Sequence, residues 1–240
     1  YLSFNSRALF MLGCGYLYVA CMTVAHALTF PGLFTSTGLL GAGPQSTAWL
    51  YMFWHGVFPL FIVAYACFKG RDDVSSVLPR RPRLPLLAAG AGMVALSAGF
   101  TALATVGQDL LPAIMDGNRY RSSMSLVVAS IWATSLLALA VLWFSRPHSV
   151  LDLWLMIMVC ASLIDIALSA MLNGGRFDLG FYAGRVYGLL AASFVLLVLL
   201  VDSGILYRKL VHLTETLKRL TAQDALTGIG NRRAFDGSLD

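Results

Sequence analysis

Apolar residues dominate six stretches of the chain, and shorter stretches between them hold most of the charge. A helix needs about 20 consecutive apolar residues to cross the hydrocarbon of a bilayer. The pattern therefore predicts an all-α fold, a polytopic bundle of membrane helices. The predicted spans are 7–28, 47–68, 84–107, 124–144, 150–172 and 183–206.

The sixth stretch continues without a proline into a charged segment that carries a regular row of leucines. Their spacings alternate between four and three residues, which is the 3.5-residue period of a coiled-coil seam. The row consists of Leu206, Leu210, Leu213, Leu217 and Leu220. We expect a helix that leaves the membrane and pairs with a second copy as a parallel coiled coil. This divides the chain into a membrane domain (1–206), a coiled-coil helix (207–223) and a final segment (224–240).

The final segment contains the motif DALTGIGNRRAF at 224–235. This motif resembles the opening of the GGDEF domain, the α+β diguanylate cyclase family. The resemblance implies that the full-length protein is a homodimer that condenses two GTP into cyclic di-GMP with Mg²⁺. Asp224 and the leucine row would then relay a signal to the cyclase domain. The family's catalytic loop lies later in the domain than these residues, so we assign no catalytic residue.

The distribution of basic residues agrees with this orientation. A domain that uses GTP lies in the cytoplasm, and six spans then place both ends of the chain there. Of the 17 Lys and Arg residues, all but Arg119, Arg121, Arg176 and Arg185 fall on the cytoplasmic side. Loops on the cytoplasmic side of a membrane protein carry an excess of Lys and Arg. We therefore predict a multi-pass protein of the bacterial cytoplasmic (inner) membrane, and we attribute the net charge of +5 to topology rather than to nucleic-acid binding.

Composition excludes a soluble globular domain. The chain is 58% hydrophobic and 12% charged, whereas soluble domains carry about 25% charged residues. The four cysteines lie inside apolar stretches without C-x-x-C spacing, so we interpret them as small apolar packing residues and predict no metal site. The spans contain no P-loop, Rossmann fingerprint or H-E-x-x-H motif.

Several polar residues occupy one layer near the predicted outer surface, and ionisable groups at membrane depth are functional candidates by default. This layer lies next to a loop, 29–47, that contains no charged residue. We expect that loop to lie on the membrane or to fold over the bundle as a lid. A layer of polar groups from several helices is suited to a small-ligand pocket. The candidate binding residues are His26, Trp54, His55, Asp165, Arg185 and Tyr187.

Other interpretations of these residues stay open. His26 can be an interfacial histidine, Arg185 a topology anchor, and the aromatic residues a membrane belt. His26 and His55 could instead ligate haem or another metal in a redox protein, although the spans place His55 roughly 9 Å deeper than His26. A third reading is a small-solute transporter with Asp165 and Arg185 on its path.

Two helices carry further local signals. The third span has small residues at alternating spacings of four and three: Ala88, Gly92, Ala95, Gly99 and Ala102. Such a stripe predicts close approach of a neighbouring helix. Ser149 and Asp152 have the spacing of a capping box, which predicts that Asp152 caps the fifth helix.

Three segments of the membrane part also resemble a family: HALTFPG (26–32), GLLGAGPQ (38–45) and WHGVFP (54–59). They are similar to the bacterial membrane-associated sensor (MASE) domains, type four, which precede GGDEF domains. The resemblance covers most of residues 1–206 and implies one further helix upstream. It implies a sensory role but identifies no cofactor or ligand. The expected function is therefore the membrane-embedded sensor of a diguanylate cyclase, with a homodimer partner, membrane lipid and an unknown small ligand.

Overall fold

The computed structural model describes residues 6–69 and 83–222, which are mostly helical. The long helices are α1 (Arg7–Thr29), α2 (Ser46–Lys69), α3 (Arg83–Ala104), α4 (Ser123–Phe144), α5 (Val150–Ile166) and α6 (Leu179–Ala222). The short elements are η1 (Gln108–Leu110), a hairpin of β1 (Met115–Asp116) and β2 (Arg119–Tyr120), and a π-helical turn, η2 (Ala167–Met171).

Five helices among the described residues are long and apolar enough to cross a membrane: α1, α2, α3, α4, and α5 extended by η2. Their ends agree with five of the predicted spans to within three residues. The sixth predicted span, 183–206, lies inside α6, a helix of 44 residues. That residues 183–206 cross the membrane remains a prediction.

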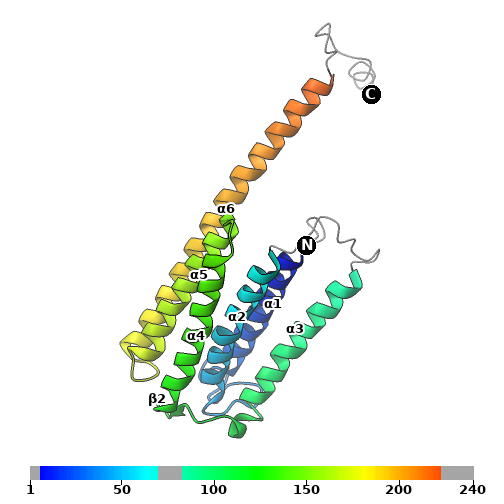
Figure 1. Ribbon diagram of the computed structural model, residues 1–240. Helices are drawn as coiled ribbons and strands as arrows, with labels where there is room; N and C mark the ends of the chain where they lie inside the picture. The colour runs from blue at the N-terminus through cyan, green and yellow to red at the C-terminus, as the bar shows by residue number, and fades with distance from the viewer. Residues whose placement is uncertain (1–5, 70–82, 223–240) are drawn as a thin grey trace. The chain divides into compact units, whose positions relative to one another are not determined.

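The first five helices lie side by side, with α3 at one edge of the group (Figure 1). Helix α2 packs against α1, α3 and α4, and α5 packs against α4. The loops that follow α1, α3 and η2 meet at one end of the bundle, which we call the loop end. One cluster of buried side chains lies toward the loop end and includes Tyr18, Leu50 and Ile166. A second lies toward the opposite end and includes Ile62 and Leu155.

The small-residue stripe of α3 is exposed in this structure, so the expectation of a neighbouring helix against it was wrong for the described residues. All five of its members are solvent-exposed in the chain. A Cβ added at Gly92 or Gly99 would meet nothing within 4 Å. Helix α3 instead buries a different face through Ser97 and Ala104. The 4–3 spacing identified a coherent face, but spacing alone does not say which face meets a neighbour.

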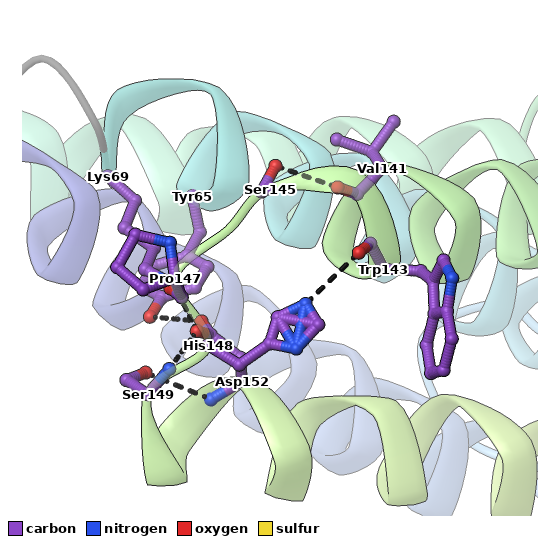
Figure 2. Close-up of polar contacts among 9 residues, drawn as sticks. All are labelled: Tyr65, Lys69, Val141, Trp143, Ser145, Pro147, His148, Ser149 and Asp152. Atoms are coloured by element: carbon purple, nitrogen blue, oxygen red, sulfur yellow. Dashed lines mark hydrogen bonds and ion pairs between the residues drawn. The ribbon is translucent and has the colours of Figure 1, made fainter.

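A polar cluster ties the helices together at the end of the bundle opposite the loops (Figure 2). The predicted cap is confirmed: the Ser149 hydroxyl accepts from the Asp152 backbone at 3.2 Å, and the Asp152 carboxylate accepts from the Ser149 backbone at 2.5 Å. The same carboxylate accepts from the Tyr65 hydroxyl at 2.8 Å and pairs with Lys69. Lys69 also donates to the Pro147 carbonyl at 2.6 Å. Because Asp152 is only 1% exposed, these bonds compensate a buried charge and join α2 to the start of α5.

Two further contacts in Figure 2 lie at the C-terminal end of α4. The Ser145 hydroxyl donates to the Val141 carbonyl at 2.7 Å, and His148 Nε2 lies 3.0 Å from the Trp143 carbonyl. The Val141 carbonyl also accepts from the Ser145 backbone at 3.0 Å, so Ser145 caps the helix with both its backbone and its side chain.

The chain divides into two compact units, Tyr1–Ala191 and Ala192–Asp240. In the second unit, α6 continues to Ala222, and the leucines at 206, 210, 213 and 217 are exposed on it. The side chain of Leu220 lies outside the described part. Asp224 and the GGDEF-like motif at 224–235 also lie outside the described residues. The expected helix is therefore present as far as Ala222, and its pairing as a coiled coil remains a prediction.

Candidate functional site

Asp165 is the acceptor at the centre of a polar network near the loop end. It accepts from the Tyr51 hydroxyl through Oδ2 at 3.0 Å and from the Ser169 hydroxyl through Oδ1 at 3.1 Å. His55 Nε2 lies 3.4 Å from the same Oδ2. These partners come from α2 and η2. The carboxylate, about 15% exposed, is therefore satisfied by side chains more than a hundred positions away in sequence as well as by its own helix.

The local fold explains why Asp165 and Ser169 meet. They are four residues apart, which puts them on one face of a helix. The chain changes from α-helix to the π-helical turn η2 at Ala167. Such turns insert into α-helices mostly as single bulges and occur often at functional sites. Here η2 carries Ser169 into contact with both Asp165 and the start of α6.

Glycines let the start of α6 approach this network. Gly180, Gly184 and Gly188 recur every fourth residue and so share a face of the helix. A Cβ at Gly184 would lie 2.0 Å from the Ser169 hydroxyl oxygen and 3.2 Å from an Asp165 oxygen. A Cβ at Gly180 would lie 3.0 Å from the Leu168 carbonyl oxygen. Without side chains on this face, α6 can lie directly against α5 and η2.

Arg185, one residue after Gly184, is placed by this close approach. Its Nη1 donates to the Ser169 hydroxyl at 3.2 Å. Its guanidinium carbon lies 4.7 Å from the ring centroid of Tyr51 and 4.2 Å from that of Phe181. Cation–π contacts of this kind contribute about 0.5–2 kcal/mol each. Ser169 therefore links Arg185 to Asp165 through a single hydroxyl group.

A second arginine reaches the site from the loop between η2 and α6. The backbone N–H of Arg176 donates to the Asn118 carbonyl at 2.6 Å, and the backbone N–H of Tyr120 donates to the Gly174 carbonyl at 3.0 Å. A Cβ at Gly175 would lie 2.1 Å from the Asn118 oxygen, so only glycine fits there. Burial lowers the pKa of Arg176 from its ordinary value, and burial raises the pKa of Tyr120. The loop is thus attached to the hairpin, which holds the Arg176 backbone in place.

These residues surround a small cavity at the loop end, with an empty volume of about 350 Å³ including its mouth. Its polar walls come from His26, Tyr51, Tyr120, Ser169, Arg176 and Arg185. Phe30, Met52, Met124 and Phe181 supply much of the apolar wall. That figure includes open solvent at the mouth, and the enclosed space is much smaller. Among the described residues, the lining combines two arginines with aromatic and hydroxyl side chains.

Four of the six predicted binding residues belong to this site. His26 and Arg185 line the cavity, and His55 and Asp165 form the network beside it. Trp54 does not line the cavity, although its ring centroid lies 4.7 Å from that of His55 and 6.3 Å from that of His26. Tyr187 does not line it either. A binding role for these two residues stays a prediction, because depth in the membrane does not determine which way a side chain faces.

The loop 29–47 does not act as a lid in this structure. Phe30 and Thr47, at its ends, line the cavity, while Leu33, Phe34 and Leu40 in its middle are exposed. The backbone of the loop turns tightly at Gly38, where a Cβ would lie 2.3 Å from the Thr29 carbonyl oxygen. Exposed apolar side chains fit the other expectation, that this loop lies on the membrane.

The geometry argues against His55 as a metal ligand. Its Nδ1 lies 2.9 Å from the Tyr51 carbonyl and its Nε2 lies 3.4 Å from Asp165, so both ring nitrogens already face protein acceptors. His26 faces aromatic rings, with centroids 6.0 Å (Phe30) and 6.1 Å (Tyr51) away. Among the described residues, no group of three His, Cys, Asp or Glu side chains could hold a metal ion. The haem reading therefore has no support from the arrangement of the two histidines.

Sequence reasoning missed Tyr51, Ser169, Tyr120 and Arg176. Two of them carried a usable signal, because Tyr51 precedes His55 by four residues and Ser169 follows Asp165 by four. Polar pairs at this spacing share a helix face. Arg176 and Tyr120 lie in loops, where no periodic pattern predicts orientation.

Comparison with known proteins bears on the membrane part of the chain. The chain matches no curated protein and no solved structure. A family model described as a membrane-associated sensor, integral membrane domain, matches residues 2–207. That range contains α1 to α5 and the whole cavity. The chain therefore belongs to MASE4, a family of membrane-associated sensor domains that are integral to the membrane.

Proposed function

We propose that this chain is the sensory and relay part of a bacterial diguanylate cyclase in the cytoplasmic membrane. A ligand would bind in the cavity at the loop end, on the outer side, and the C-terminus would lie in the cytoplasm. Membership of MASE4 supports the sensory role. The resemblance of 224–235 to the opening of a GGDEF domain supports the connection to cyclic di-GMP.

One observation carries the relay mechanism: α6 contains both a wall of the cavity and the leucine row. It is a single helix from Leu179 to Ala222. Arg185 lines the cavity and Gly184 contacts the network beside it. A ligand that moved Arg185 would therefore act on the helix that continues into the leucines.

The leucine row supports a dimer. Its members from Leu206 to Leu217 are between 59% and 69% exposed in the single chain. Outside a membrane such a row is unfavourable in water, and a parallel coiled coil would bury it. The cyclase reaction of the resembling family also needs two copies, because it joins two GTP molecules.

Signalling then depends on two arrangements of the paired helices. A ligand can shift the balance between them only through its difference in affinity for the two. Changing the ratio from 1:99 to 99:1 would need an affinity difference of about 10⁴-fold. A modest rotation of the coiled coil is sufficient if it changes how two cyclase domains face each other.

The test uses the full-length protein in lipid nanodiscs and measures cyclic di-GMP formed from GTP. One variant lacks two residues, Lys209 and Leu210, which breaks the heptad phase. The matched control lacks seven residues, 209–215, which shortens the helix but keeps the phase. We expect the two-residue deletion to change activity severalfold and the seven-residue deletion to retain most of it.

Equal activity of both deletions and the unchanged protein would overturn the relay mechanism. Analytical ultracentrifugation provides the second criterion, because a monomer in nanodiscs would remove the proposed dimer. If the unchanged protein and both deletion variants bind GTP but form no cyclic di-GMP, the proposed cyclase activity is wrong.

A further inference from the structure

The cavity at the loop end is lined by two arginines that form no direct ion pair with an acidic side chain in the described part of the chain. Arg176 and Arg185 both line it, and its lining contains no Asp or Glu. The two ion pairs found among the described residues are His55–Asp165 and Lys69–Asp152. Neither involves these arginines.

Asp165 is the nearest candidate counter-ion, and its oxygens are already in use. It accepts from Tyr51 and Ser169 and faces His55. Ser169 stands between it and Arg185. Asp178, close in sequence to Arg176, is exposed and forms no ion pair in the described part.

Arg176 offers a free donor to a ligand, whereas one donor of Arg185 is already engaged. Nη2 of Arg176 is buried and has no hydrogen-bond partner among the described residues. Arg185 uses Nη1 for Ser169, and its flat faces pack on Tyr51 and Phe181. A buried donor without a partner is unfavourable, and an unpaired buried charge is more so. An anion in the cavity would relieve both costs.

The apolar residues of the lining indicate the chemical character of the rest of the ligand. Phe30, Tyr51 and Phe181 present aromatic surface, and Met52 and Met124 present flexible apolar surface. The enclosed space is small, so it would hold the charged head group of a ligand, and the body would extend into the mouth. Guanidinium groups bind carboxylates through paired N–H···O bonds, which a planar carboxylate matches best.

We propose that this cavity binds a small organic carboxylate with an aromatic or compact apolar body. The carboxylate would lie between the guanidinium groups of Arg176 and Arg185, and the body against the aromatic walls. This inference rests on the proposed sensory function, for which it names the class of ligand.

Calorimetric titration of the full-length protein in zwitterionic lipid nanodiscs tests the proposal with four probes. Benzoate has the charge and the ring, benzamide has the ring without the charge, phosphate has charge without an apolar body, and decanoate has a long chain. We expect benzoate to bind at least tenfold more tightly than benzamide and phosphate. Equal affinity for benzamide overturns the role of the charge, and equal or tighter binding of phosphate overturns the organic ligand. Tight binding of decanoate without benzoate overturns the compact body and indicates a lipid-derived acid.

Substitutions locate the site. Arg176→Gln and Arg185→Gln are each expected to weaken benzoate binding at least tenfold. Arg121→Gln is the matched control, because Arg121 is exposed and does not line the cavity; it should leave binding unchanged. If a glutamine variant fails to fold, Arg185→Lys takes its place. It keeps the charge but loses the planar fork, and it should weaken benzoate binding severalfold. Benzoate binding that survives all substitutions of Arg176 and Arg185 overturns the site.

Cyclic di-GMP production, measured in the same samples, separates the two proposals. Benzoate that binds through both arginines without changing cyclase activity would preserve the ligand class and overturn sensing. A cyclase that responds to the coiled-coil deletion but shows no binding of any carboxylate would preserve the relay and overturn the ligand class.

Discussion

His55 Nε2 lies 3.4 Å from an Asp165 oxygen, while Nδ1 of the same ring lies 2.9 Å from the Tyr51 carbonyl oxygen. A carbonyl oxygen only accepts, so the proton on Nδ1 is required there. Nε2 then faces the Asp165 carboxyl group, so the His55 ring lies between the Tyr51 backbone and Asp165.

This relationship predicts strong coupling between the two residues. His55→Leu or Asp165→Leu alone leaves one buried polar partner uncompensated, which costs about 3 kcal/mol of folding stability. The double variant should lose less than the sum of the two, by about 1–3 kcal/mol. Unfolding of the purified protein in detergent by denaturant measures the cycle. Strictly additive losses would show that the two side chains do not interact.

The glycine face of α6 predicts an unusual response to alanine. Alanine favours a helix over glycine by about 1 kcal/mol. Gly204→Ala places its new Cβ with nothing within 4 Å, so its folding stability should rise or stay unchanged. Gly184→Ala should instead destabilise by about 1–3 kcal/mol, because its Cβ would lie 2.0 Å from the Ser169 hydroxyl oxygen. The melting temperatures of both variants test this. A Gly184→Ala variant as stable as Gly204→Ala would mean that α6 does not pack closely on η2.

The pairing of Lys69 with Asp152 predicts a large effect at the opposite end of the bundle. Lys69→Met leaves the Asp152 carboxylate, 1% exposed, without its cation. We expect a loss of about 1–3 kcal/mol. Tyr65→Phe removes one hydrogen bond to the same carboxylate and should cost about 1 kcal/mol. Lys209→Met, on an exposed position of α6, is the control and should be near neutral. Similar melting temperatures for Lys69→Met and Lys209→Met would contradict this role.

Gln45 supports the segment before β1. Its Oε1 accepts from the backbone of Ile114 and Met115, both at 2.9 Å, and its Nε2 donates to the Met115 carbonyl at 2.8 Å. Gln45→Met removes all three bonds and should cost about 2 kcal/mol or more. Gln108→Met is the same replacement at a residue whose Oε1 is buried without a partner among the described residues, so it should cost less. Thermal unfolding of the two variants compares them directly. A smaller loss at Gln45 would mean that its three bonds are not formed.

Tyr120 gives a pH-dependent prediction. Its hydroxyl donates to the Ser169 carbonyl at 2.7 Å, and burial raises its pKa above the ordinary 10.0, against the opposing effect of Arg185 and Arg176. A raised folded pKa means that the stabilisation is complete below about pH 10 and is lost as the pH rises through the folded value. Tyr120→Phe should therefore lower stability by about 1 kcal/mol at pH 8, and this difference should shrink at pH 11. Tyr182→Phe, on an exposed side chain, is the control. A difference that stays constant with pH would contradict the prediction.

The helices and their approximate ends follow from the sequence because apolar length is a local property. The capping of α5 by Ser149 and Asp152 is equally local, and the sequence predicted it correctly. The same reasoning placed His26, His55, Asp165 and Arg185 in one layer, because depth follows from counting residues along a helix.

Which faces meet was decided by the tertiary structure. Tyr51 and Asp165 are 114 positions apart, and Lys69 and Asp152 are 83 apart. Pairing across such distances depends on how each helix is rotated, which a membrane span's hydropathy hardly specifies because lipid and a protein core are both apolar. For this reason Trp54 and Tyr187 share the depth of the cavity but do not line it, while Arg176, in a loop without periodicity, does.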